Sequence, residues 1–320
     1  MEIAIVSGKG GAGKTTLATR LFQSSPGDVL LDCDVEAPNC ALLLDTVWER
    51  REVFEVEYPE IRDELCTGCG ACASFCAFGA MLAAPDMAVP IPERCHACGG
   101  CALVCPHDAV IYGRRPAGEI AVGYAGGSGI VSGELALGEF SGTALIRRLR
   151  DAAGELEGTG TVWIDGPPGT GCSAVAAVDE ADFVVLVAEP TPFGLADMTM
   201  AVEMLRKLGR PFGVVVNKVG IGDDQIFDYC RDEAIPVLGE IPFSLEMARA
   251  YSRGRDGWRD AAEPDVFARL ARVIKAEAGR NVRDDCGPVG ELGELEHLGE
   301  QQAQVQTQTQ AQVQKGEARL

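Results

Sequence analysis

The sequence predicts an α/β fold with a mostly parallel sheet, interrupted by a small inserted α+β domain. Short apolar strands alternate with helical segments at both ends of the chain, which is typical of a parallel sheet covered by helices. Between them, residues 59–115 are rich in Cys, Gly and Pro, show no long periodic helix and contain an internal repeat. Because strand and helix signals resume afterwards, this stretch is an insertion into one α/β domain.

The first α/β elements precede the insertion. Residues 2–6 (EIAIV) predict a buried strand, a Gly-rich loop follows, and a helix is expected over about 14–23. Residues 28–32 (DVLLD) predict a second strand. We therefore assign residues 1–58 to the first part of the α/β domain, and expect the insertion to begin near Pro59.

The second part of the domain is expected over residues 116–280, after a turn at 114–118. Its predicted strands are 161–165, 183–188 and 213–217, and its predicted helices are 145–153, 196–208 and 265–278. Residues 281–320 are Gln-rich and nearly free of large apolar side chains, so we expect a disordered tail. This tail is not a basic amphipathic helix and makes a poor membrane anchor.

Composition excludes several classes of protein. The chain has 320 residues with 47% hydrophobic and 24% charged residues, and no apolar run approaches the length of a bilayer. Its N-terminus does not resemble a signal peptide, so we expect a cytoplasmic location. A net charge of −20 disfavours nucleic acids and anionic membranes as partners. Thirteen cysteines in a cytoplasmic chain favour metal or redox chemistry over structural disulfides.

Residues 8–15 (GKGGAGKT) match a phosphate-binding loop. Glycines let successive backbone N–H groups turn toward an anion, and the following helix adds its positive end. In this pattern Lys14 contacts the β- and γ-phosphates and the Thr15 hydroxyl binds Mg²⁺. The expected nucleotide-binding residues of the loop are Gly8, Gly10, Gly11, Gly13, Lys14, Thr15 and Thr16. The position between a strand and a helix favours an ATP site over a chance Gly-rich turn.

Eight cysteines form two runs with the spacing C-x2-C-x2-C-x3-C. Such a run supplies three thiolates to one [4Fe–4S] cluster and its fourth to another, and the stretch resembles bacterial two-cluster ferredoxins. We expect the first cluster on Cys66, Cys69, Cys72 and Cys105, and the second on Cys95, Cys98, Cys101 and Cys76. Zinc is the alternative, but zinc sites usually separate two CxxC pairs by a longer gap. Ala77 replaces the usual proline after Cys76 and removes no ligand.

With Lys9 included, the loop resembles that of the deviant phosphate-loop ATPases, the family of MinD, Mrp and the nitrogenase iron protein. Their KGGxGKT/S motif is matched by residues 9–15. The resemblance covers about residues 1–280 and is closest to MinD-superfamily ATPases with an inserted ferredoxin domain. It implies a nucleotide-dependent, face-to-face homodimer in which Lys9 reaches the partner's phosphates. The alternative is a solvated lysine.

Further segments resemble the same family. Residues 32–34 end the second strand, where the family places its first switch, and this resemblance implies that Asp34 orients or activates the attacking water and that Asp32 assists Mg²⁺. Asp165 begins a segment that resembles the second switch and would hold Mg²⁺ through water. The amide of Asn217 can both donate to and accept from adenine. Turn or helix caps are the alternatives for these residues. Residues 189–191 also resemble the family, without an assigned role.

Three functions are compatible with these motifs. The first is an ATPase whose hydrolysis cycle gates electron transfer through two clusters to an unidentified redox partner. The second is a carrier that delivers clusters to client proteins, although no CxxC pair near the C-terminus supports it. The third is a MinD-type positioning ATPase with structural clusters, which the acidic Gln-rich tail disfavours. Cys33 and Cys172 lie beside the two switches, but we interpret them as buried small hydrophobic residues rather than redox sensors.

Overall fold

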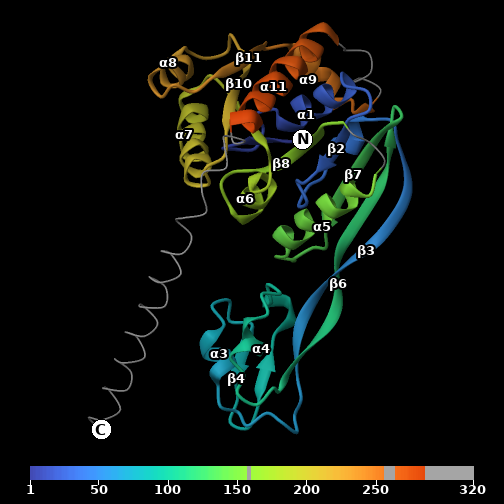
Figure 1. The fold of residues 1–320 in the computed structure, drawn as a ribbon, viewed down its shortest axis with the longest axis vertical. Coiled ribbons are helices and arrows are strands. Elements are labelled where there is room, and N and C mark those ends of the chain that lie inside the picture. Colours follow the sequence, from blue (N-terminus) through green and yellow to red (C-terminus); the bar gives the residue numbers. More distant parts are fainter. Residues whose placement is uncertain (157–159, 256–263, 285–320) are drawn as a thin grey trace. The chain divides into compact units, whose positions relative to one another are not determined.

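The computed structural model describes residues 1–156, 160–255 and 264–284 (Figure 1). Within these residues a nine-stranded sheet has the order β11-β10-β9-β1-β8-β2-β7-β6-β3. Its parallel strands are β1 (Glu2–Ser7), β2 (Val29–Asp32), β7 (Ser128–Leu135), β8 (Val162–Pro168), β9 (Phe183–Ala188), β10 (Phe212–Val219) and β11 (Val237–Pro242). Strands β3 (Thr46–Ile61) and β6 (Val110–Ala125) add antiparallel pairs at one edge. The predicted α/β fold with a mostly parallel sheet is confirmed.

Helices cover both faces of the sheet, and each face has its own apolar core. Successive side chains of a strand point to opposite faces. Ala4 and Val6 therefore pack in one core, whereas Ile3 and Ile5 pack in the other. The helices are α1 (Lys14–Gln23), α2 (Cys40–Leu43), α5 (Gly142–Gly154), α6 (Cys172–Val178), α7 (Pro192–Lys207), α8 (Gln225–Asp232), α9 (Leu245–Ser252) and α11 (Pro264–Asp284).

The predicted strands and helices all occur, with shifts at their ends. The final helix continues to Asp284, so the first residues assigned to a disordered tail are helical. Residues 285–320, the rest of that predicted tail, lie outside the described residues. No helix in the described part of the chain combines the length and apolar character that crossing a bilayer requires.

The predicted turn at 114–118 is wrong, because these residues lie inside β6. Figure 1 shows β3 and β6 side by side as a long twisted ribbon, paired from Thr46 with Ala125 to Ile61 with Val110. Pro116 is tolerated because it lies opposite Glu55 next to a shift in register. The expected limits of the insertion, 58/59 and 115/116, therefore fall within continuous strands. The ribbon joins the α/β body, which comprises the described residues of 1–45 and 126–281, to the Cys-rich segment 62–109.

The Cys-rich segment consists of two similar halves offset by 29 residues. Its short elements are α3 (Ala71–Phe75), β4 (Met81–Ala83), β5 (Ala88–Pro90), a 3₁₀ turn (Pro92–Arg94) and α4 (Gly100–Leu103). The repeat extends to the backbone: φ is +75° at Gly70 and +76° at Gly99, its counterpart. These left-handed residues turn the chain tightly around each group of cysteines.

Candidate nucleotide and cysteine sites

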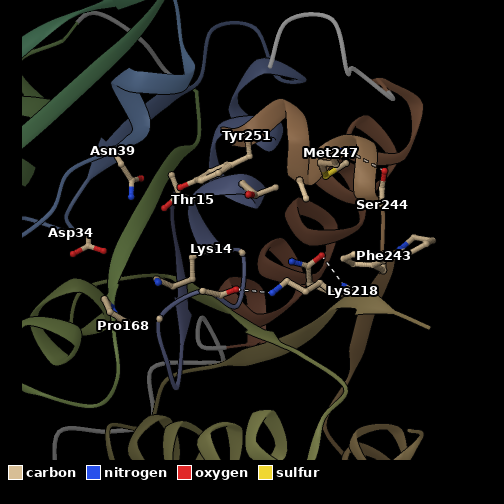
Figure 2. A pocket seen from close by; sticks show the side chains of 17 residues that line it. Lys14, Thr15, Asp34, Asn39, Pro168, Lys218, Phe243, Ser244, Met247 and Tyr251 are labelled. Atoms are coloured by element: carbon tan, nitrogen blue, oxygen red, sulfur yellow. Dashed lines mark hydrogen bonds between the residues drawn. The ribbon is translucent and has the colours of Figure 1, made fainter. Parts of the chain in front are cut away.

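A cavity of about 340 Å³ lies at the carboxyl end of the parallel strands, in the size range of small-molecule sites. In Figure 2, Lys14 and Asp34 lie toward one end of this cavity, and Phe243 and Ser244 lie toward the other. Its lining residues are Gly10, Gly11, Gly13, Lys14, Thr15, Thr16, Asp34, Asn39, Pro168, Asn217, Lys218, Pro242, Phe243, Ser244, Met247, Ala248 and Tyr251. Most residues predicted for nucleotide binding thus share one cavity.

Two glycines of the phosphate loop are required by close packing. A Cβ at Gly8 would lie 2.0 Å from the carbonyl oxygen of Asp197, and one at Gly13 would lie 2.1 Å from Asn217 Nδ2. Gly13 also has a φ of +101°, a conformation that other residues rarely adopt. Gly10 has open space instead. The loop is therefore held tightly at its two ends and leaves its centre free for an anion.

Two fully buried carboxylates lie beneath the loop. Thr15 Oγ1 donates to Asp165 Oδ2 at 2.6 Å, and the backbone N–H groups of Asn39 and Cys40 each donate to Asp32 Oδ2 at 3.0 Å. Burial raises the pKa of Asp32 to about 8, and the nearby carboxylate of Asp165 adds to this effect. Burial likewise raises the pKa of Asp165 to about 6. The charge of Lys14 and the Thr15 hydrogen bond partly offset this cost at Asp165, but among the described residues neither acid forms an ion pair.

These residues fit the divalent cation that accompanies a nucleotide. The Oδ1 atoms of Asp32 and Asp165 are buried without a hydrogen-bond partner. Mg²⁺ prefers oxygen ligands, and Thr15, which lines the cavity, donates its hydroxyl to the buried carboxylate of Asp165. Asp34, half-buried on the cavity wall, has its pKa raised by burial while the charge of Lys14 acts in the opposite direction.

Lys9 is not a freely solvated lysine in this structure. Its Nζ lies 3.2 Å from Glu189 Oε2, and Lys218 Nζ lies 3.3 Å from the other oxygen of the same carboxylate. Lys218 Nζ also donates to the carbonyl oxygen of Gly11 at 2.9 Å. Glu189, which had no role in the sequence analysis, therefore holds two lysines at the mouth of the phosphate loop.

Asn217 ties the end of β10 to the phosphate loop. Its Nδ2 donates to the carbonyl oxygen of Ala12 at 2.8 Å, and its Oδ1 accepts from the N–H of Lys218 at 2.9 Å. One N–H and one lone pair remain for a base. The sequence analysis did not predict the opposite wall of the cavity, which consists of residues 242–244 and α9. A strand followed by Ser244, a residue type that often begins a helix, was the available sign of this wall. In the structure Ser244 caps α9, and its Oγ accepts from Met247 N at 3.1 Å.

The eight cysteines of the two runs line two separate cavities, and each cavity combines both runs. The first is lined by Cys66, Cys69, Cys72 and Cys105, and the second by Cys76, Cys95, Cys98 and Cys101. Backbone N–H groups point at the sulfur atoms: Ala80 N lies 3.3 Å from Cys76 Sγ, and its repeat counterpart Ala109 N lies 3.3 Å from Cys105 Sγ. Each cavity thus holds three cysteines of one run and the fourth of the other.

The remaining cysteines differ in exposure. No disulfide joins any of the cysteines that the structure describes. Cys33 is buried as expected, but Cys172, at the start of α6, is exposed, so its interpretation as a buried residue is wrong. Cys40 and Cys230 are buried, and Cys286 lies outside the described residues.

A phosphate loop between β1 and α1, with one buried acid at the end of β2 and another within β8, defines a P-loop nucleotide site. The CobQ/CobB/MinD/ParA nucleotide binding domain family matches residues 3–257. The chain therefore belongs to this family, whose MinD/ParA members are nucleotide-hydrolysing P-loop ATPases.

Relatives extend over most of the chain. An uncharacterized protein of Methanocaldococcus jannaschii is 35% identical over 255 residues, which is 78% of this chain and 87% of the relative. An iron-sulfur cluster carrier protein of Pyrococcus horikoshii is 24% identical and covers 87% of this chain and 89% of its own. The septum site-determining protein MinD of P. horikoshii, solved with Mg-ADP, shares the fold at 19% identity and a TM-score of 0.50, over 88% of this chain and 98% of its own.

Proposed function

We propose that this chain is an ATPase whose nucleotide cycle gates electron transfer through two [4Fe–4S] clusters in the insertion, residues 59–115. The observation that carries the proposal is the division of eight cysteines between two cavities, with one cysteine exchanged between the runs. This exchange is the ligand pattern of two-cluster ferredoxins. N–H groups directed at Sγ atoms stabilise thiolate charge and tune the potential of such clusters.

The nucleotide chemistry follows from the loop and its buried acids. Lys14 binds the β- and γ-phosphates, Asp34 orients the attacking water, and Asp165 holds Mg²⁺ through water with Asp32 in support. Mg²⁺ supplies charge neutralisation at the phosphates when it is bound. Asn217 contacts adenine. In a nucleotide-dependent homodimer Lys9 leaves Glu189 and reaches the partner's phosphates.

A continuous set of contacts supports coupling between the nucleotide and the insertion. Val35 follows Asp34 in the first switch segment, and its carbonyl oxygen accepts from Leu135 N, at the end of β7, at 2.9 Å. The next residue, Ala136, donates its N–H to the carbonyl oxygen of Ala117 in β6 at 2.9 Å. These contacts provide a direct route by which a movement of the switch would reach the ribbon that carries the insertion.

The loop 136–141 makes the second half of this connection. Its Glu139 pairs with Arg115, and the Arg115 guanidinium also donates to the carbonyl oxygen of Pro92, within the insertion, at 3.0 Å. Phe140 stacks at 5.9 Å on His96, which in turn stacks on Phe78 at 3.8 Å. Both His96 and Phe78 line the second cysteine cavity. The loop thus joins the first switch to the surroundings of the second cluster.

The energies of the two processes are comparable. Lowering a one-electron potential by about 200 mV costs roughly 5 kcal/mol, since about 59 mV corresponds to a factor of ten. Inverting a two-state population with a ligand requires about 5.5 kcal/mol of differential binding. The free energy of a nucleotide-driven switch is therefore comparable to the free energy needed to lower a cluster's potential by about 200 mV.

The test is anaerobic purification followed by ATPase assays on oxidised and reduced protein. We expect about eight iron and eight sulfide per chain, and an ATPase rate that depends on the oxidation state. The Phe140→Ala variant should lose this dependence while keeping its iron, whereas Leu137→Ala, a fully exposed position in the same loop, should retain it. Zinc in place of iron, or equal rates in both oxidation states, would contradict the proposal.

A cluster carrier is the second candidate, because two relatives are named iron-sulfur cluster carrier proteins. The absence of a further CxxC pair in this sequence opposes it. Incubation of the reconstituted protein with an apo-ferredoxin separates the two functions. Clusters that pass intact to the acceptor support a carrier, whereas clusters that stay bound and titrate reversibly support electron transfer.

A further inference from the structure

One buried group of side chains next to the nucleotide cavity includes a soft metal ligand. Asp32 ends β2, Asp165 lies in β8 and Cys40 begins α2, so three elements converge here. One ligand atom from each lies within 4.8 Å of the others, and all three side chains are completely buried. Cys40 belongs to neither cysteine run, and no local pattern in the sequence predicts its position next to the two acids.

The polar atoms of this group are poorly satisfied. Asp165 Oδ2 accepts from Thr15 Oγ1 at 2.6 Å and from Cys40 Sγ at 3.3 Å. The Oδ1 atoms of Asp32 and Asp165 have no hydrogen-bond partner. Two carboxylates buried together repel each other and lose their hydration, and a bound cation relieves both costs. The orphaned oxygens therefore indicate a cation site.

The thiol changes which cation this site prefers. Mg²⁺ selects oxygen ligands, whereas thiolates select softer ions such as Zn²⁺ and Cd²⁺. A tetrahedral ion with bonds of about 2.3 Å to sulfur and about 2.1 Å to oxygen holds these ligands about 3.6 Å apart. The observed separation of 3.3 Å between Cys40 Sγ and Asp165 Oδ2 needs little adjustment.

We propose that Asp32, Cys40 and Asp165 bind a thiophilic divalent cation in the nucleotide-free protein, with the Thr15 hydroxyl or water as the fourth ligand. Binding displaces the thiol proton of Cys40 and the proton that burial keeps on the Asp32 carboxyl, and both are released to solvent. Because Asp165 and Thr15 also serve the nucleotide's Mg²⁺, the two ions exclude each other. A thiophilic metal thus inhibits nucleotide binding. This inference does not depend on the proposed electron transfer, since Cys40 lies outside the cluster cavities.

Cd²⁺ is a suitable probe, added to protein whose iron sites are already filled. Elemental analysis after desalting should find one more Cd²⁺ per chain in the wild type than in the Cys40→Ala variant. Cd²⁺ that binds near the clusters is present in both proteins and cancels in this difference. Titration with a fluorescent ADP analogue should show that Cd²⁺ weakens Mg-dependent binding competitively. Cys40→Ser, which replaces sulfur by oxygen at nearly the same size, should lower the ratio of Cd²⁺ to Mg²⁺ affinity by at least about tenfold.

Cys230→Ala is the matched control, because Cys230 is equally buried and lies in α8, away from the nucleotide cavity. It should keep the additional Cd²⁺ and the competition. The proposal is overturned if Cys40→Ala retains the additional Cd²⁺, or if Cys40→Ser leaves the affinity ratio unchanged. The ratio remains informative even if a Cys40 variant weakens both ions through a change in packing.

Discussion

The body and the Cys-rich segment 62–109 differ in what holds them together. The body has two apolar cores, in which strands such as β9 are buried along their whole length. In the segment, the buried apolar cluster contains Cys72, Met81 and Ala88, with partly buried cysteines packed around it, and the small side chains of Ala80 and Ala109 are also buried. Hydrophobic burial can stabilise the body by itself, whereas we expect a segment this poor in apolar contacts to depend on the proposed clusters for its stability. The first two of the four predictions below test this difference, and the other two examine charged groups of the body.

Loss of a cysteine ligand should produce the largest effect, and only in the segment. Cys72 is buried in the first cysteine cavity, so Cys72→Ala should lose about half of the bound iron. Amide hydrogen exchange should rise by about 100-fold or more over residues 62–109, because metal binding and folding are coupled there. Exchange in the body should not change. Cys230→Ala, a buried thiol of the body, is the control that should keep all its iron.

The converse experiment removes the nucleotide while leaving the segment intact. Lys14→Ala should weaken MgATP binding by about 100-fold, since a buried charge-assisted contact to phosphate is lost. Iron content should stay at the wild-type level. Lys207→Ala, at an exposed position of α7, controls for loss of charge. If iron were lost together with ATP affinity, the two regions would not be independently assembled.

The buried acids make the stability of the free body depend on pH. The pKa of Asp32 is raised to about 8 in the folded protein, so folding favours its protonated form. This contribution is complete below the ordinary carboxyl pKa near 4 and is lost as the pH rises through about 8. Asp32→Asn cannot ionise, and at pH ~8.5 it should be more stable than wild type by an amount on the order of 2 kcal/mol.

Urea unfolding without Mg²⁺ or nucleotide measures this difference. Below pH ~4 Asp32 is neutral in both the folded and the unfolded wild type, so the two proteins should then differ little. If Asp32→Asn loses as much stability as the wild type when the pH is raised, Asp32 is not the cause of that loss.

Release of Lys9 should have the smallest effect. Glu189→Gln removes the carboxylate that holds Lys9 at 3.2 Å, and partly exposed ion pairs contribute only about 0–1 kcal/mol. The nucleotide-dependent dimer should therefore tighten by a few-fold, as measured by sedimentation with a non-hydrolysable ATP analogue. Glu203→Gln alters an exposed pair on α7 and should leave the dimer unchanged. Weaker dimers in Glu189→Gln would instead indicate that Glu189 acts in the interface.

The ribbon of β3 and β6 was not predicted, for a physical reason. Residues 46–61 carry many charged side chains, and β3 is an edge strand, so it lacks the continuous apolar run of a buried strand. In the sequence, Pro59 and Pro116 indicate the ends of strands, but both lie inside strands of the structure. They are tolerated because Pro59 lies in the edge strand β3 and Pro116 lies outside the part of β6 that pairs with β7. Pairing with the other strand, rather than local sequence, decides this structure.

Local spacing alone determined the phosphate loop and the two cysteine runs, because a loop around an anion and a cluster both need donors that are close neighbours in the chain. The same is true of the strands that are buried on both faces. Only the tertiary structure decided that Cys40 meets Asp165, that Glu189 holds Lys9, and that Phe140 reaches His96. These contacts join residues far apart in the sequence, and no local pattern records which side chains the packing of strands and loops will bring together.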